Sequence, residues 1–267
     1  NIVDRIYIGH IPNVGALALT GVGVCMPLIM IVAAFAALVG NGGAPRASIF
    51  MGQGDTESAE KTLGNCFLTQ LIISAILTIV LLIGNRTFLL SFGASENTIE
   101  YAVSYMNIYA IGTLFVQLTL GMNAFITAQG FAKTGMLSVL IGAVTNIILD
   151  PILIFGLCGA PRLGIAGAAT ATVIGQIIAM SLAVFFNITK NTDVSLSFRK
   201  MKPHGATIGS IYRVGIPSII MQAIGSIMTY GMNKILAPFS TTAVAVFGVY
   251  FKLNSFIFMP VFGLNNG

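Results

Sequence analysis

The chain has 267 residues, of which 56% are hydrophobic and only 8% are charged. Soluble domains average about 45–50% apolar and about 25% charged residues, so a water-exposed surface cannot be built from so few charges. The composition therefore excludes an ordinary soluble domain and makes the bilayer the main solvent.

Eight runs of mostly apolar residues follow one another, and a helix needs about 20 such residues to cross a bilayer. They cover residues 1–9, the tail of a first span, and then 16–39, 63–84, 101–128, 136–157, 165–188, 207–236 and 241–267. Turn residues separate them, as at His10-Ile11-Pro12-Asn13 and Gly159-Ala160-Pro161-Arg162. The predicted fold class is an all-α, polytopic transmembrane helix bundle.

Positive charge indicates how the spans are oriented, because cytoplasmic loops carry an excess of Lys and Arg. The loops after the second, fourth and sixth spans hold Arg46, Lys61, Lys133, Lys190, Arg199, Lys200 and Lys202, whereas the opposite loops hold only Arg86 and Arg162. The first set is therefore predicted to be cytoplasmic, in a multi-pass protein of the inner or plasma membrane. The longest polar connection, Lys190–Gly205, reads as a linker between two halves.

The two ends of the sequence and the absence of an ATP-binding motif narrow the possible functions further. The chain opens on Asn1 without an initiator Met or a basic leader and stops at Gly267 directly after an apolar run, so we expect a piece of a longer protein. No Walker loop occurs, so ATP is not expected as the direct energy source, and we expect neither an enzyme nor a cofactor.

Only two of the eight acidic residues, Asp4 and Asp150, lie inside predicted spans. A charge at mid-bilayer costs about 2.5–3.5 kcal/mol on insertion scales, so such residues usually mark ion or proton pathways. At 1.5 Å per residue, both lie roughly 8–12 Å from the outer ends of their spans. Two acids from separate helices are therefore predicted to share one level in the membrane.

Two neutral polar residues reach the same level. Asn146 lies four residues before Asp150, on the same helix face, and Thr172 lies about seven residues into the next span, which re-enters from outside. Carboxylate, amide and hydroxyl oxygens suit a hard cation such as Na⁺, and a carboxyl group away from water can also carry a proton. The alternative is a structural role, in which each Asp pairs with a nearby base or caps a broken helix.

Other polar residues in the predicted spans have several possible roles. Gln117, Asn123 and Gln129 on the fourth span are candidates for a substrate cavity, with interhelical hydrogen bonding as the alternative. Lys252 in the last span would contact substrate, pair with an acid elsewhere, or extend to the membrane surface.

Several of these motifs together resemble a known family. The run Asn146-Ile147-Ile148-Leu149-Asp150-Pro151-Ile152-Leu153-Ile154-Phe155-Gly156, followed by Gly164-Ile165-Ala166-Gly167-Ala168-Ala169-Thr170-Ala171-Thr172, resembles the fifth and sixth spans of the multidrug and toxin extrusion (MATE) family. Further similarity lies at Asn1-Ile2-Val3-Asp4, at Gly52-Gln53-Gly54-Asp55 and at Val214-Gly215-Ile216-Pro217. The resemblance covers the whole chain.

The resemblance implies a transporter of two six-helix lobes that exchanges H⁺ or Na⁺ for lipophilic, often cationic compounds. The chain would then be the N-lobe (1–189), the inter-lobe linker (190–206) and the start of the C-lobe (207–267). The family's N-lobe cation site maps onto Asp4, Asn146, Asp150 and Thr172. The seventh span has no acid between Ile216 and Leu236, which makes the chain similar to the DinF-like branch.

The predicted function is therefore secondary active multidrug efflux in exchange for H⁺ or Na⁺. Its expected partners are small lipophilic or cationic substrates and the bilayer, with no nucleic acid, and the full-length protein is expected to be a monomer. A lipid or lipid-linked glycan flippase of the same superfamily is one alternative. A membrane receptor or scaffold that transports nothing is another.

Overall fold

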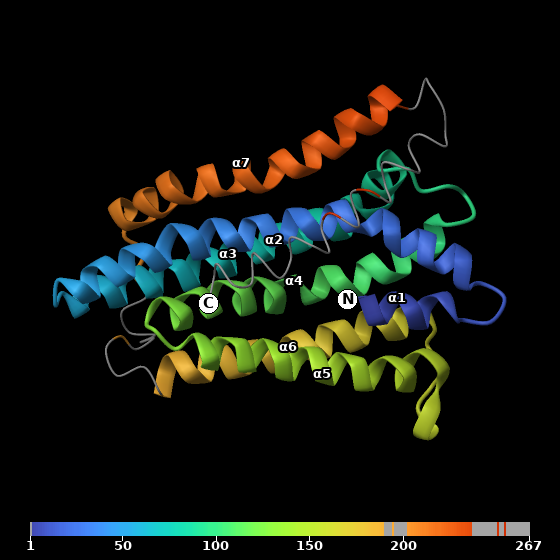
Figure 1. Cartoon of the computed structure of the whole chain (residues 1–267), viewed down its shortest axis with the longest axis horizontal. Helices are drawn as coiled ribbons and strands as arrows, with labels where there is room; N and C mark the ends of the chain where they lie inside the picture. The colour runs from blue at the N-terminus through green and yellow to red at the C-terminus, as the bar shows by residue number, and fades with distance from the viewer. Residues whose placement is uncertain (1, 190–193, 195–201, 237–249, 251–253, 255–267) are drawn as a thin grey trace. The chain divides into compact units, whose positions relative to one another are not determined.

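The computed structural model describes residues 2–189, 194, 202–236, 250 and 254 of the chain. Its helices are α1 (Ile2–Gly9), α2 (Gly15–Gly52), α3 (Thr56–Ser91), α4 (Ile99–Ala128), α5 (Ala132–Phe155), α6 (Ile165–Thr189) and α7 (Gly205–Leu236), with a short 3₁₀ turn, η1 (Leu157–Gly159) (Figure 1). No strand occurs among the described residues, and the predicted all-α class is confirmed.

Five of the described helices, α2 to α6, are long and apolar enough to cross a membrane. Their outer faces carry large apolar side chains without protein cover, such as Ile83, 83% exposed, and Met136, 65% exposed. A soluble protein rarely leaves so much apolar surface in water, so these faces meet lipid. The chain is a multi-pass membrane protein.

Helix α2 runs further than the hydropathy pattern predicts. The glycine-rich run Gly40–Gly43, where the sequence predicts the end of the second span, lies inside it. A side chain at Gly42 would meet the Ile211 carbonyl oxygen of α7, and one at Gly43 would meet the Cys66 sulfur of α3. These glycines therefore serve close helix packing and do not terminate the helix.

Two helix ends follow standard turn chemistry. Asp55 caps α3 by accepting a hydrogen bond from the Ser58 amide at 3.0 Å, which satisfies one of the free N–H groups of the first turn. Gly156 ends α5 with φ +76°, a left-handed conformation that favours glycine. The second end fixes where the chain turns from α5 toward α6.

The described chain divides into two compact units, residues 1–219 and 220–267. In the first unit α4 is the most buried of the five spanning helices and contacts α2, α3, α5 and α6, while α1 lies against α2, α5 and α6. The predicted eighth span and most of the predicted linker lie outside the described residues. The boundaries of the two lobes therefore stay a prediction.

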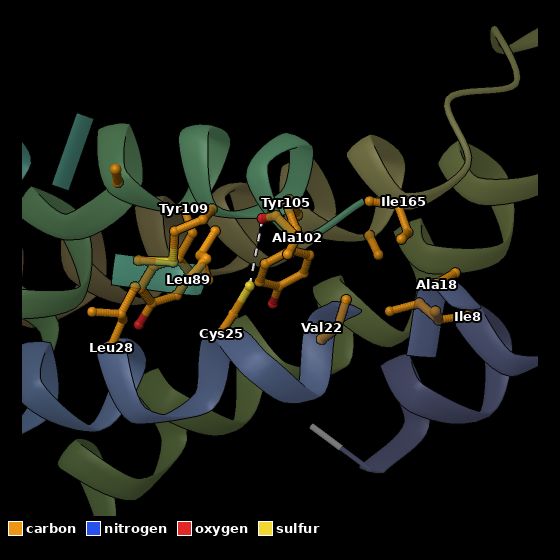
Figure 2. Close-up of a cluster of buried hydrophobic side chains, with 14 of the residues drawn as sticks. Ile8, Ala18, Val22, Cys25, Leu28, Leu89, Ala102, Tyr105, Tyr109 and Ile165 are labelled. Carbon is orange, nitrogen blue, oxygen red and sulfur yellow. Dashed lines mark hydrogen bonds between the residues drawn. The ribbon is translucent and has the colours of Figure 1, made fainter. Parts of the chain in front are cut away.

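A buried apolar cluster holds α1, α2, α4 and α6 together (Figure 2). Ile8 of α1 is fully buried in it, and the Cys25 thiol of α2 donates to the Ala102 carbonyl of α4 at 3.5 Å. Tyr105 and Tyr109 of α4 enter the same cluster. Because Ile8 lies one helical turn after Asp4, this packing also fixes the position of the Asp4 carboxyl group.

Candidate cation-binding site

The structure brings together the four residues that the sequence predicts to share one level. We call Asp4 of α1, Asn146 and Asp150 of α5 and Thr172 of α6 the polar cluster. All four are buried, with Asp150 at 0% and Asp4 at 3% exposure. The cluster therefore joins three helices across their shared interior.

Hydrogen bonds run through the polar cluster from end to end. The Asn146 side-chain amide donates to Asp150 Oδ1 at 3.3 Å and to Thr172 Oγ1 at 3.4 Å. The Thr172 hydroxyl lies 3.3 Å from Asp4 Oδ2 and 3.0 Å from the Ala168 carbonyl oxygen, and its one proton serves either acceptor. All three bonds between cluster side chains are long for their type, so the network is loosely closed.

Two carboxylate oxygens in the cluster have no hydrogen-bond partner among the described residues, Asp4 Oδ1 and Asp150 Oδ2. The two carboxyl groups are linked through Asn146 and Thr172, and in the described part of the chain neither forms an ion pair. Two buried like charges repel each other strongly in a medium of low dielectric constant. A proton or a cation that neutralises one of the charges would stabilise such a pair.

Tyr105 of α4 adds a group that sequence reasoning missed. Its side chain lies close enough to Thr172 and to the Asp4 carboxyl group to interact with both. The ring is 5% exposed and stacks on Tyr109 with centroids 6.3 Å apart. The i, i+4 spacing of two tyrosines inside a span was the available signal, since it puts both on one helix face.

The predicted cavity residues make contacts between helices. Gln117 is fully buried and donates to the Val32 carbonyl of α2 at 2.8 Å, and Asn123 donates to the Gly135 carbonyl of α5 at 3.0 Å. These bonds match the alternative reading, interhelical hydrogen bonding. Gln129 lies at the end of α4, and Lys252 is outside the described residues. Their roles in a substrate cavity stay predictions.

A pocket of about 270 Å³ lies among the α1–α2 turn, α4 and the start of α6. It is lined by Ile11, Val14, Tyr101, Ser104, Leu163, Gly164, Ile165 and Ala166. Tyr101 lies one helical turn before Tyr105, so both side chains fall on one face of α4. Ile8, which is fully buried, lies between Asp4 and the pocket residue Ile11 along the chain.

Comparison with known proteins assigns the chain to a family. The family model named MatE matches residues 1–152, which include Asp4, Asn146 and Asp150. The chain belongs to the MatE family. Thr172 lies beyond the matched stretch.

Relatives of this MatE chain are named as transporters. Multidrug export protein MepA of Staphylococcus haemolyticus is 29% identical over 269 residues, and an FAD transporter of Shewanella oneidensis is 26% identical over 266 residues. Both alignments cover 100% of this chain and 58% of the relative. The chain thus spans little more than half the length of these relatives.

Solved structures agree with the fold. A MATE crystal structure in the bent conformation matches with a TM-score of 0.90 at 26% identity, covering 99% of this chain and 58% of that one. A MOP superfamily transporter from Pyrococcus furiosus matches with a TM-score of 0.89 at 26% identity, covering 100% and 58%. The predicted MATE membership and cell-membrane location are confirmed, while assignment to the DinF-like branch stays a prediction.

Proposed function

We propose that the full-length protein is a secondary active antiporter that exports lipophilic or cationic compounds in exchange for H⁺ or Na⁺. The observation that carries this proposal is the polar cluster, in which two buried carboxyl groups share an interior without a basic partner among the described residues. Buried acids in a membrane interior are costly and rare, and they usually mark an ion or proton pathway.

The cluster gives the ion a way to act on the helices. Asp4 belongs to α1, which has only eight described residues, whereas Asn146 and Asp150 belong to the long helix α5. An ion or proton shared by Asp4 and Asp150 removes their repulsion and favours close packing of α1 on α5 and α6. Loss of the ion restores the repulsion and favours a looser packing, so the ion shifts the population between two states.

The substrate class rests on the relatives. Several Staphylococcus relatives are named multidrug export proteins, which supports small, chemically varied substrates. The FAD transporter of Shewanella oneidensis is a relative with a different named substrate. Export assays therefore need both a lipophilic cation and an anionic dinucleotide as test compounds.

The test is ion-driven efflux from vesicles that contain the full-length protein, under separate Na⁺ and H⁺ gradients. We expect Asp150→Asn to lower efflux to the rate seen without a gradient. The matched control is Glu100→Gln, which neutralises an exposed carboxylate whose partner is Arg86 at 2.8 Å. Asp150→Asn that transports at the wild-type rate would overturn the coupling role.

The alternatives make different predictions in the same vesicles. A lipid or lipid-linked glycan flippase would move labelled lipid between leaflets and would leave the test compounds inside. A receptor or scaffold would move neither. Dependence of efflux on one of the two ion gradients decides between H⁺ and Na⁺.

A further inference from the structure

Helices α5 and α6 touch backbone to backbone beside the polar cluster. A Cβ atom on Gly142 would lie 2.6 Å from the Gly175 carbonyl oxygen, and one on Gly175 would lie 2.7 Å from the Gly142 carbonyl oxygen. Real Cβ atoms essentially never approach another heavy atom below 3.0 Å. Any larger residue at either position must therefore push the two helices apart.

A second contact of the same kind lies on the other side of the cluster. A Cβ atom on Gly167 of α6 would lie 2.6 Å from the Leu153 carbonyl carbon of α5. Asn146 and Asp150 fall between positions 142 and 153 of α5, and Thr172 falls between positions 167 and 175 of α6. The two glycine contacts therefore bracket the polar cluster along both helices.

One of the contacts reaches the cluster itself. A Cβ atom on Gly175 would lie 3.2 Å from the Cβ atom of Asn146. The Asn146 amide already lies 3.4 Å from Thr172 Oγ1, and a pair at about 3.6 Å is no longer a hydrogen bond. A separation of a few tenths of an ångström is therefore enough to break the bond between α5 and α6.

We propose that Gly142 and Gly175 are positioning residues of the cation site. By letting α5 and α6 approach at backbone distance, they hold Asn146 where it bonds both Asp150 and Thr172. The inference rests on the proposed function, because it assumes that the cluster binds the coupling ion. The competing explanation is plain packing, since small residues commonly let membrane helices approach closely.

Ion binding by the purified full-length protein separates these explanations. The thermal unfolding midpoint is measured against NaCl concentration, with choline chloride holding the ionic strength constant, and against pH in choline chloride alone. We expect Gly175→Ala and Gly142→Ala to raise the half-saturating Na⁺ concentration by about tenfold, the lower end of the usual cost of losing a residue that orients a metal ligand, because the glycines act only through the position of Asn146. If the coupling ion is a proton, we expect the pH at which protonation gives half of its stabilising effect to shift by about one unit or more.

The matched control is Gly42→Ala, whose Cβ atom would meet the Ile211 carbonyl oxygen between α2 and α7, away from the cluster. It should lower the unfolding midpoint and leave half-saturation unchanged. If Gly142→Ala does not fold, adding Ala179→Gly removes its second clash, at 2.8 Å, and keeps the contact with Gly175. Plain packing predicts that every variant loses stability and that none changes half-saturation, and that result would overturn the proposal.

The binding assay keeps this inference distinct from the proposed function. A wild-type protein that binds an ion in detergent but shows no ion-driven efflux in vesicles defeats the antiport proposal and leaves the positioning proposal to be decided by half-saturation. A wild-type protein that neither ion stabilises overturns the cation site and the positioning role together. An effect of Gly175→Ala without one of Gly142→Ala also contradicts the role of helix spacing, because both widen the same contact.

Discussion

Replacing Thr172 by valine tests the middle of the polar cluster with almost no change of shape. Valine removes the Thr172 hydroxyl. That hydroxyl lies 3.3 Å from Asp4 Oδ2 and accepts a hydrogen bond from the Asn146 amide at 3.4 Å. The Asn146 amide keeps its bond to Asp150, so we expect a loss of folding free energy of about 1 kcal/mol or less. The main effect should fall on the ion, because α6 no longer contributes an oxygen.

The size of that effect follows from the bond lengths. Interhelical hydrogen bonds in membrane proteins contribute about 0.6 kcal/mol on average and at most about 1.7 kcal/mol. Thr172 takes part in two such bonds, both long, so their sum falls between the average and the maximum, and 1.4 kcal/mol corresponds to a factor of ten. We therefore expect the half-activating ion concentration for efflux to rise about threefold to tenfold.

The assay is efflux from vesicles against a graded Na⁺ gradient, repeated with a pH gradient. Thr170→Val is the matched control, because Thr170 lies on the same helix and bonds only within it, to the Ala166 carbonyl at 2.7 Å. We expect the control to keep the wild-type half-activation. Equal behaviour of Thr172→Val and Thr170→Val would refute the role of the Thr172 hydroxyl.

The remaining predictions concern residues outside the polar cluster. Gln117→Leu should lower the unfolding free energy by about 0.6–1.7 kcal/mol and leave the substrate KM unchanged, because the amide bonds α2. Gly121→Ala should destabilise by about 1–3 kcal/mol in thermal unfolding, because its Cβ atom would meet the Gln70 side chain. The Ser58 hydroxyl and, next to it, the Ser58 amide hold the pKa of Asp55 below its usual 3.8, so the cap should be intact at neutral pH. Its protection of the first turn of α3 from hydrogen exchange should fade as the pH drops below 3.8, because a lowered folded-state pKa adds stability only where the acid is ionised.

Each of these predictions has a contrasting variant or result. Gly23→Ala meets nothing within 4 Å and should be neutral or slightly stabilising, which isolates the clash at Gly121. Glu57→Gln removes only an exposed pair with Lys61 at 3.4 Å, so it should leave exchange in α3 nearly unchanged. A raised substrate KM for Gln117→Leu at unchanged stability would restore the reading that Gln117 lines the cavity.

Depth counting predicted the polar cluster well because its rules are local to each helix. The rise per residue placed Asp4 and Asp150 at one level, and the i, i+4 rule put Asn146 beside Asp150. Both rules need only the positions of the turns, which the apolar runs mark clearly. The all-α membrane fold follows from the same runs.

What the sequence did not reveal depends on contacts between helices. Tyr105 lies beside the cluster because α4 packs on α6. The spacing of Tyr105 and Tyr109 puts both on one face of α4, but it does not say which helix that face meets. The continuation of α2 through Gly40–Gly43 likewise depends on α3 and α7, which fill the space that side chains would need. Glycine is a weak helix former on its own, so the local sequence predicted that the helix ends at this run. Packing against α3 and α7 instead favours a continuous helix.

The charge of the unpaired oxygens favours an ion site over a purely structural network. Amides elsewhere in the bundle make bonds from 2.8 Å, as from Gln117 to the Val32 carbonyl, to 3.4 Å, as from Asn85 to the Val103 carbonyl. Gln117 and Gln70 also each keep an Oε1 atom without a partner among the described residues, but those groups are neutral. In the polar cluster the bonds between side chains are 3.3–3.4 Å, although two of the three involve carboxylates, which normally form the shorter kind. Each carboxylate also keeps one oxygen without a partner among the described residues. A network selected for stability would close these contacts, whereas an exchangeable ion needs ligands that stay separated and free to receive it.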